Sequence, residues 1–172
     1  MTDVHSREVR SHNMASIKNK DTKPEIMVRK FLFSKGFRFR VNVKSLPGKP
    51  DIVLKKYRTV IFVNGCFWHG HEGCKYFVIP QTRTEWWMEK IRKNKERDSE
   101  EREKLRNAGW NIIVVWECQL KPKQREATLS GIESLLQQFF LNMNRKKVVA
   151  DYLFPMVAEP EEEYKRAGNK DY

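Results

Sequence analysis

The chain has 172 residues, of which 40% are hydrophobic, so its length and composition suit one domain with a substantial core. Its 34 Lys and Arg outnumber its 22 Asp and Glu, which gives a net charge of +12. This charge favours a nucleic-acid-binding protein over a basic protein whose lysines are simply solvated. The sequence contains no apolar run long enough for a membrane span and no apolar signal-peptide core at its start, so we expect neither. Its three cysteines are then expected to be reduced, as in the cytoplasm, and available to a metal.

Residues 1–21 are polar and basic, and we treat them as an N-terminal arm. Met14 and Ile17 are three residues apart, so they would share one face of a short helix. Two interpretations stay open. The arm is loose and the two apolar residues are incidental, or these side chains wedge into the minor groove of DNA.

The first helix is expected to begin at Thr22 and to end near Gly36. Thr22 can cap the helix, Pro24 is tolerated in its first turn, and Glu25 can complete a capping box. Glu25 therefore has two candidate roles, as a partner in the cap or as a carboxylate that holds a metal-bound water.

The remaining elements alternate between short apolar runs and longer amphipathic segments. Strands are predicted at 37–41, 51–54, 59–63 and 111–116, and helices at 84–108 and 127–143. The second and third strands should pair as a hairpin. The order is helix, three strands, helix, strand, helix, which predicts a mixed α/β architecture around a central sheet. We place the folded domain at 22–145 and a flexible, partly acidic tail at 146–172.

The segment 65–74 follows a predicted buried strand and is rich in His, Cys and aromatic residues. Within it, His71 and Cys74 have a spacing close to that of structural zinc sites, which need four ligands. Cys118, just after the last strand, is a candidate for a remote ligand. Cys66 is left over by this assignment and is interpreted as a small buried apolar residue.

The helix at 84–108 offers a further candidate ligand. Trp87, Ile91, Asn94, Asp98 and Leu105 have spacings that place them on one inward face. A carboxylate there is costly unless it pairs or binds a metal, so Asp98 is expected to form a salt bridge with an Arg or to bind the metal. The complete zinc set would then be His71, Cys74, Asp98 and Cys118.

Asp51 lies between Pro50 and a predicted strand, where a carboxylate can reach a cleft. Backbone carbonyls at the end of the strand 59–63 would lie beside it, and such oxygen ligands suit Mg²⁺. The alternative is an ordinary turn aspartate that accepts hydrogen bonds from local backbone N–H groups.

The aromatic pairs Phe67-Trp68 and Trp86-Trp87 lie in or beside polar segments. Trp87 is expected in the core, whereas exposed aromatic residues of a basic protein are candidates for stacking on bases. Basic residues at 81–84 and 92–95, among them Arg83 and Lys93, could contact phosphates.

Together these motifs resemble the very-short-patch-repair endonucleases, enzymes that nick DNA at T:G mismatches, over roughly residues 6–140. The matching segments are Ser11-x-Asn13-Met14, Leu46-Pro-Gly-x-Pro-Asp51, Val60-Ile-Phe, Gly65-Cys-Phe-Trp-His69, Thr82-Arg-Thr-Glu-x-Trp, Glu96-Arg-Asp98 and Val115-Trp-Glu-Cys118. The resemblance implies a restriction-endonuclease-like fold and a monomer that acts in the bacterial cytoplasm on nucleoid DNA. It also implies mismatch-repair proteins as partners.

The resemblance also implies roles for single residues. Asp51 and the backbone carbonyl of Val63 would bind catalytic Mg²⁺, His69 would be the general base, and Glu25 would hold a metal-bound water. A structural Zn²⁺ would be held by the four residues named above. Phe67, Trp68 and Trp86 would enter the duplex from the major groove, and Met14 and Ile17 from the minor groove.

The sequence departs from the family at two places. Asn64 stands where well-known members have a second active-site His, and the zinc-site Cys follows His71 by one residue more than usual. An Asn can donate a hydrogen bond to a phosphate but cannot become cationic. These departures motivate one alternative to a T:G-specific nicking enzyme, a restriction-type or broad-mismatch nicking enzyme. A second alternative stays open, a zinc-stabilised DNA-binding module without catalysis, in which Asp51 would have no catalytic role.

Overall fold

The protein is described by a computed structural model that covers residues 8–9, 12, 15, 18 and 20–153, with side chains described up to residue 145. Met14, Ile17 and the acidic end of the chain lie outside these residues, and with them the predicted roles of the arm. In the part of the chain that the structure describes, no helix is both long and apolar enough to cross a membrane.

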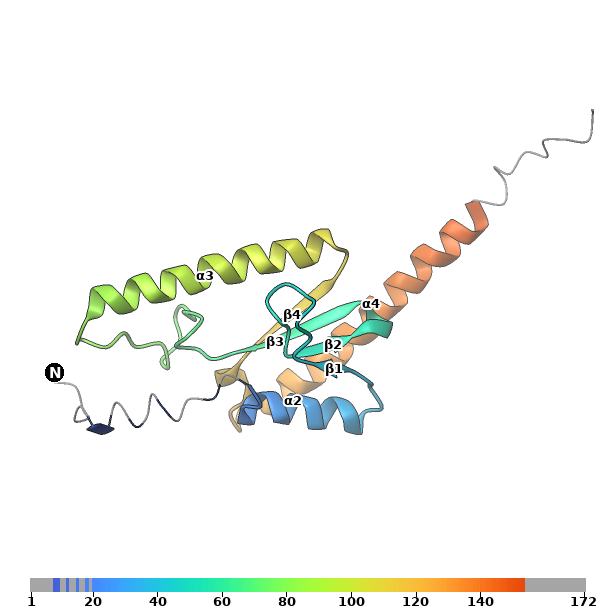
Figure 1. Ribbon diagram of the computed structural model, residues 1–172. Helices are drawn as coiled ribbons and strands as arrows, with labels where there is room; N and C mark the ends of the chain where they lie inside the picture. Colours follow the sequence, from blue (N-terminus) through green and yellow to red (C-terminus); the bar gives the residue numbers. More distant parts are fainter. Residues whose placement is uncertain (1–7, 10–11, 13–14, 16–17, 19, 154–172) are drawn as a thin grey trace, which may run out of the picture.

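A four-stranded mixed sheet forms the centre of the molecule, with its strands in the order β1-β2-β3-β4 (Figure 1). The strands are β1 (Arg40–Val41), β2 (Ile52–Leu54), β3 (Thr59–Asn64) and β4 (Asn111–Trp116). The first three are antiparallel, and β3 and β4 are parallel. A parallel pair needs a crossover connection, and the long helix α3 (Thr84–Asn107) forms part of it. The predicted α/β class, the element order and the β2–β3 hairpin are confirmed.

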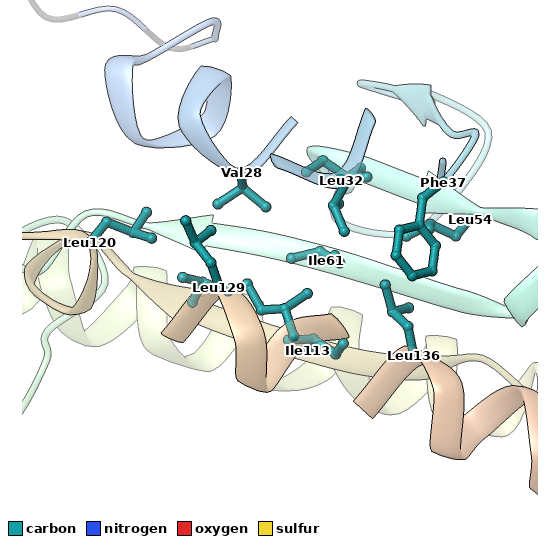
Figure 2. Packing of buried hydrophobic residues seen from close by; sticks show 12 residues of the cluster. Val28, Leu32, Phe37, Leu54, Ile61, Ile113, Leu120, Leu129 and Leu136 are labelled. Atoms are coloured by element: carbon teal, nitrogen blue, oxygen red, sulfur yellow. The ribbon is translucent and has the colours of Figure 1, made fainter. Parts of the chain in front are cut away.

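Helices cover both faces of the sheet. Helices α2 (Lys23–Ser34) and α4 (Arg125–Leu153) lie on one face, and α3 lies on the other (Figure 1). The larger core cluster joins α2 and α4 to the sheet, and Figure 2 shows Leu32, Ile61 and Leu136 within it. A smaller cluster on the other face packs Leu105 of α3 against Val53 and Val60. Each fully buried aliphatic side chain stabilises such a core by about 1.5–3 kcal/mol relative to an exposed one.

The pairing of β3 with β4 determines where the loops that follow them lie. The two strands are in register from Thr59 opposite Asn111 to Asn64 opposite Trp116. Both strands therefore end at the same edge of the sheet. The loop after β3, which begins at Gly65, is brought beside the short 3-10 helix η2 (Glu117–Leu120) after β4.

Two predicted elements have different bounds in the structure. The strand predicted at 37–41 is reduced to β1, because the antiparallel register places the residues before Phe39 opposite the 3-10 helix η1 (Lys55–Tyr57) that follows β2. The last helix begins at Arg125 and continues to Leu153 instead of ending near 143. It therefore extends into the range predicted as a flexible tail, since the segment up to Leu153 contains no Gly or Pro that would end a helix after its early turns.

Candidate active site and metal centre

Asp51 lies at the junction between the turn 46–50 and β2, as the sequence predicts. Its Oδ2 accepts a hydrogen bond from the backbone N–H of Val63, at 2.7 Å, so the carboxylate faces the end of β3. Burial raises the pKa of Asp51 to about 6. The Val63 N–H opposes this effect, and the negative charge of nearby Glu25 adds to it. A half-buried carboxylate with a second carboxylate nearby is an environment that favours a bound cation.

Glu25 is a partner in the helix cap, and its carboxylate also lines the groove that contains Asp51. Its backbone N–H donates to Thr22 Oγ1 at 3.4 Å, which confirms the predicted N-cap. Its side chain is buried, with Oε1 accepting from the Thr22 hydroxyl at 2.8 Å and Oε2 from the Asp21 N–H at 2.9 Å. The cap thus holds this carboxylate in the groove that also contains Asp51.

His69 is paired with Asp98 of α3. The distance from His69 Nδ1 to Asp98 Oδ2 is 2.5 Å. An ionised carboxylate can only accept, so in the neutral imidazole Nδ1 carries the proton and Nε2 has the lone pair. One turn before Asp98, Asn94 Nδ2 donates to the backbone carbonyl of Trp68 at 3.0 Å. Two consecutive loop residues are therefore fixed by two side chains of one helix.

This pairing corrects the predicted zinc set. Asp98 lies on the inward face of α3, as predicted. Its side chain pairs with His69, whereas the sequence analysis expected a salt bridge with an Arg or a bond to the metal. The helical periodicity identified the face correctly. It could not identify which loop residue would meet that face.

A groove of about 660 Å³ joins these groups. Its lining includes the predicted site residues Glu25, Asp51, Val63, Asn64 and His69. It also includes five cationic side chains that the sequence did not single out: Lys18, Lys20, Lys44, Lys49 and Arg97. A groove lined by two carboxylates, an imidazole and five cationic side chains is suited to an anionic substrate such as a phosphodiester.

Three cysteines and one histidine form a separate cluster beside the groove. Their ligand atoms all lie within 4.8 Å of one another: Cys66, His71, Cys74 and Cys118. His71 Nδ1 is 3.5 Å from both Cys66 Sγ and Cys118 Sγ. Its ring stacks on Trp116, with ring centroids 4.1 Å apart. Three sulfurs and one imidazole in a closed group match the ligands of a structural zinc site.

Cys66 thus takes the place that we predicted for Asp98. It is completely buried, as the sequence analysis expected, and its burial raises the pKa of its thiol to about 12 in the metal-free protein. From the sequence alone, a cysteine that is buried in the core cannot be distinguished from a buried cysteine that binds a metal. The number of cysteines could have indicated the ligand set, because the three cysteines and His71 supply four ligands without any carboxylate.

Gly70 separates the two sites. It has a φ of +60°, so the chain turns sharply between His69 and His71. His69 faces Asp98 in consequence, whereas His71 faces the cysteines. A Cβ at Gly70 would lie 2.9 Å from Ile91 Cγ2 of α3, which explains why the turn needs glycine.

The aromatic residues form one cluster at the start of α3. Trp87 contacts Phe67, Trp68 and Trp86, with ring centroids 5.2, 5.9 and 4.7 Å apart. Trp86 is 53% exposed, whereas Phe67, Trp68 and Trp87 are partly buried. Trp87 is therefore the centre of the cluster, and Trp86 is its solvent-facing member.

The two predicted phosphate contacts lie outside the groove. Arg83 is exposed at the N-terminus of α3, and Lys93 is exposed on its outer face, 3.2 Å from a carboxylate oxygen of Glu89. The sequence signal for cations in the groove was weak, because Lys44 and Lys49 lie in a turn whose shape is fixed only by the fold.

Comparison with known proteins gives a consistent result. A sequence profile described as "DNA mismatch endonuclease Vsr" matches residues 2–75. The chain is 54% identical over 123 residues to "Type II nicking enzyme V.NmeAIP" of Neisseria meningitidis, which covers 72% of this chain and 87% of the relative. It is 47% identical over 125 residues to "DNA mismatch endonuclease Vsr" of Escherichia coli K12, covering 73% and 80%. A third relative, "Type II nicking enzyme V.XorIIP" of Xanthomonas oryzae pv. oryzae, is 47% identical over 70% of this chain and 88% of its own length.

Proposed function

Because this chain belongs to the DNA mismatch endonuclease Vsr family, we propose that it nicks duplex DNA on the 5′ side of the T in T:G mismatches. The chain is a DNA endonuclease, a hydrolase of mismatch repair. Such mismatches arise when 5-methylcytosine is deaminated to thymine, and the nick would begin very short patch repair. This role implies action on nucleoid DNA in the bacterial cytoplasm.

The pairing of His69 with Asp98 beside Asp51 is the observation that carries the proposal. With Nδ1 protonated, His69 Nε2 can take a proton from the water that attacks the phosphorus. Asp98 holds this tautomer and stabilises the imidazolium that forms, as the carboxylate does in a catalytic triad. Cleavage would leave a 5′-phosphate and a 3′-hydroxyl.

Asp51 and the backbone carbonyl of Val63 would hold a catalytic Mg²⁺. The residues fit this ion, since a half-buried carboxylate close to a second one offers hard oxygen ligands in a groove open to phosphate. Bound Mg²⁺ would stabilise charge on the scissile phosphate and the leaving oxygen. Glu25 would orient a water beside the ion, and the buried Asn64 would donate a hydrogen bond to the phosphate.

Zn²⁺ in the cluster of Cys66, His71, Cys74 and Cys118 would have a structural role. The cluster ties the loop that carries His69 to the end of β4 through Cys118. Four protein ligands leave no open position for substrate, which is the usual difference between structural and catalytic zinc.

Recognition of the mismatch would use the aromatic cluster. Phe67, Trp68 and Trp86 would wedge into the duplex, and a mismatched step is easier to unstack than a matched one. Met14 and Ile17 of the arm would enter the minor groove. Arg83 and Lys93 would contact phosphates, in addition to the cations of the groove.

A strand-specific nicking assay tests the proposal. It compares a T:G duplex with its C:G counterpart, with and without Mg²⁺, and uses Asp51→Ala as the control variant. We expect a Mg²⁺-dependent nick beside the mismatched T, and none with the variant or the matched duplex. A wild-type protein that binds both duplexes and cuts neither would contradict the proposal.

A second candidate differs in specificity only. Two of the relatives described above are named as type II nicking enzymes, and Asn64 is a neutral residue in the groove. These observations favour testing a restriction-type or broad-mismatch nicking enzyme as well. Equal cutting of a panel of mismatched duplexes would support that candidate over T:G specificity.

A further inference from the structure

Arg29 connects the carboxylate of Glu25 to the residue where the N-terminal arm meets the domain. Its Nη2 donates to Glu25 Oε2 at 2.7 Å, and its Nη1 donates to Asp21 Oδ1 at 2.5 Å. The side chain is only 13% exposed, although it lies one helical turn from the groove. Arg29 is thus part of the structure around Glu25 and not a surface ion pair.

The two oxygens of Glu25 are used unequally. Oε2 accepts from both the Arg29 guanidinium and the Asp21 N–H, which occupies its two lone pairs. Oε1 accepts only from the Thr22 hydroxyl among the described residues, so one lone pair remains. Oε1 is therefore the oxygen that can accept a further hydrogen bond from a water.

Asp21 makes both of its contacts through an uncommon backbone conformation. Its φ is +55°, a region that non-glycine residues occupy at a cost of about 1 kcal/mol or more. In this conformation its N–H donates to Glu25 while its carboxylate pairs with Arg29. The backbone conformation of Asp21 and the orientation of the Glu25 carboxylate are therefore held by the same contacts.

A simple helix cap does not need this arrangement. Thr22 already caps the helix, and burial leaves Arg29 Nε without a hydrogen-bond partner in the described part of the chain. A buried unpaired N–H costs about 1–3 kcal/mol. The positive charge of Arg29 does compensate the negative charges of Glu25 and Asp51. Glu25 raises the pKa of Asp51, and Arg29 opposes this effect.

We propose that Arg29 is a positioning residue of the active site. Together with the Asp21 N–H it saturates Oε2 of Glu25, it leaves Oε1 to orient a water, and it connects that carboxylate to the Asp21 carboxylate. The inference rests on the proposed nicking function and deepens it. It assigns to a residue outside the reacting groups the task of holding the Glu25 carboxylate in position for the chemistry.

The test compares Arg29→Met and Arg29→Lys with wild type, and Arg38→Met is the matched control. Arg38 is exposed, packs over Phe33, and its loss removes the same charge. Single-turnover nicking at saturating DNA should fall about 10- to 100-fold in Arg29→Met, as is usual for residues that orient ligands of a metal site. Arg29→Lys keeps the charge and one contact, so its rate should be intermediate. The dissociation constant for DNA should change less than about 3-fold, within the effect of one phosphate contact.

Metal binding distinguishes a positioning role of Arg29 from a merely structural one, because a merely structural role would not make metal binding tighter. Removal of a cation beside two carboxylates should tighten Mn²⁺ binding to the DNA-free protein, measured by electron paramagnetic resonance, while the nicking rate falls. The double variant of Arg29→Met with Asp21→Asn should be no slower than Arg29→Met alone, because both act on Glu25.

The outcomes separate the two proposals. A wild-type protein that does not nick refutes the proposed function, and the Mn²⁺ titration still tests Arg29. A nicking rate in both Arg29 variants equal to that of wild type overturns the inference alone. If Arg29→Met does not fold, Arg29→Lys decides: an unchanged rate overturns the inference and a slower rate supports it.

Discussion

Replacement of Asp51 by Asn should stabilise the metal-free protein while it abolishes nicking. The Asn side chain has the same shape, and its Oδ1 can still accept the hydrogen bond from the Val63 N–H. The substitution removes a charge that is half-buried near Glu25. A residue retained for chemistry at the expense of stability is expected to behave in this way.

The magnitude follows from the pKa of Asp51, which burial raises from its ordinary value of 3.8 to about 6. Below pH 3.8 the carboxyl group is protonated in the folded and unfolded states, so the charge costs nothing. Above pH 6 it is ionised in both states, and the folded state bears the full cost of about 3 kcal/mol. The stability gained by Asp51→Asn should therefore rise with pH, from about 1.5 kcal/mol at pH 5 to about 3 kcal/mol at pH 8.

Urea unfolding at several pH values measures this gain. The buffer should contain neither Mg²⁺ nor a chelator, so that any metal in the Cys and His cluster stays in place. Glu103→Gln is the control, because Glu103 is an exposed carboxylate of α3 and its loss should change stability by less than about 0.5 kcal/mol. Destabilisation by Asp51→Asn at pH 8, or a gain that does not vary with pH, would refute this account of the buried charge.

Three further predictions concern the loop and its neighbours. Metal analysis should find that Cys66→Ser loses zinc and Asp98→Asn retains it while losing activity; full zinc content in the Cys66 variant would contradict the ligand set. Gly70→Ala should lower the free energy of unfolding by about 1–3 kcal/mol, because of its positive φ and the close approach to Ile91, and a negligible loss in urea unfolding would mean that the loop relaxes. Trp86→Ala should leave the melting temperature nearly unchanged but reduce the preference for T:G over matched duplexes, since this side chain is mostly exposed; unaltered preference in the nicking assay would count against its role as a wedge.

The features of this fold that the sequence predicts are those that depend on local periodicity. The inward face of α3 is an example: Ile91 and Leu105 are buried, and Asn94 and Asp98 are turned toward the loop. Helical spacing of three, four and seven residues is enough to identify such a face. The cap at Thr22 was predictable for the same reason, because all its partners lie within one turn.

The partners of those residues were not predictable, because they depend on how distant segments meet. Asp98 faces His69 only because Gly70 turns the chain between the two histidines. Cys66 reaches Cys118 only because β3 and β4 are parallel and in register at their ends. The residue types of both sites can be read from the sequence. Which residue belongs to which site depends on the tertiary contacts.

The long helix α3 explains how one loop can serve two sites with little freedom in either. Asn94 and Asp98 are four residues apart, so they lie on one face of the helix about 6 Å apart along its axis, and they reach the turn 66–70 at Trp68 and at His69. Each side chain forms one hydrogen bond to the loop, and the cluster of Cys66, His71, Cys74 and Cys118 holds the loop on both sides of Gly70. These attachments define the position of the His69 ring before any substrate arrives, which is the preorganisation that the proposed general base would require. On the proposed mechanism, the cluster of three cysteines and His71 would contribute to catalysis through geometry, although no substrate atom would need to touch it.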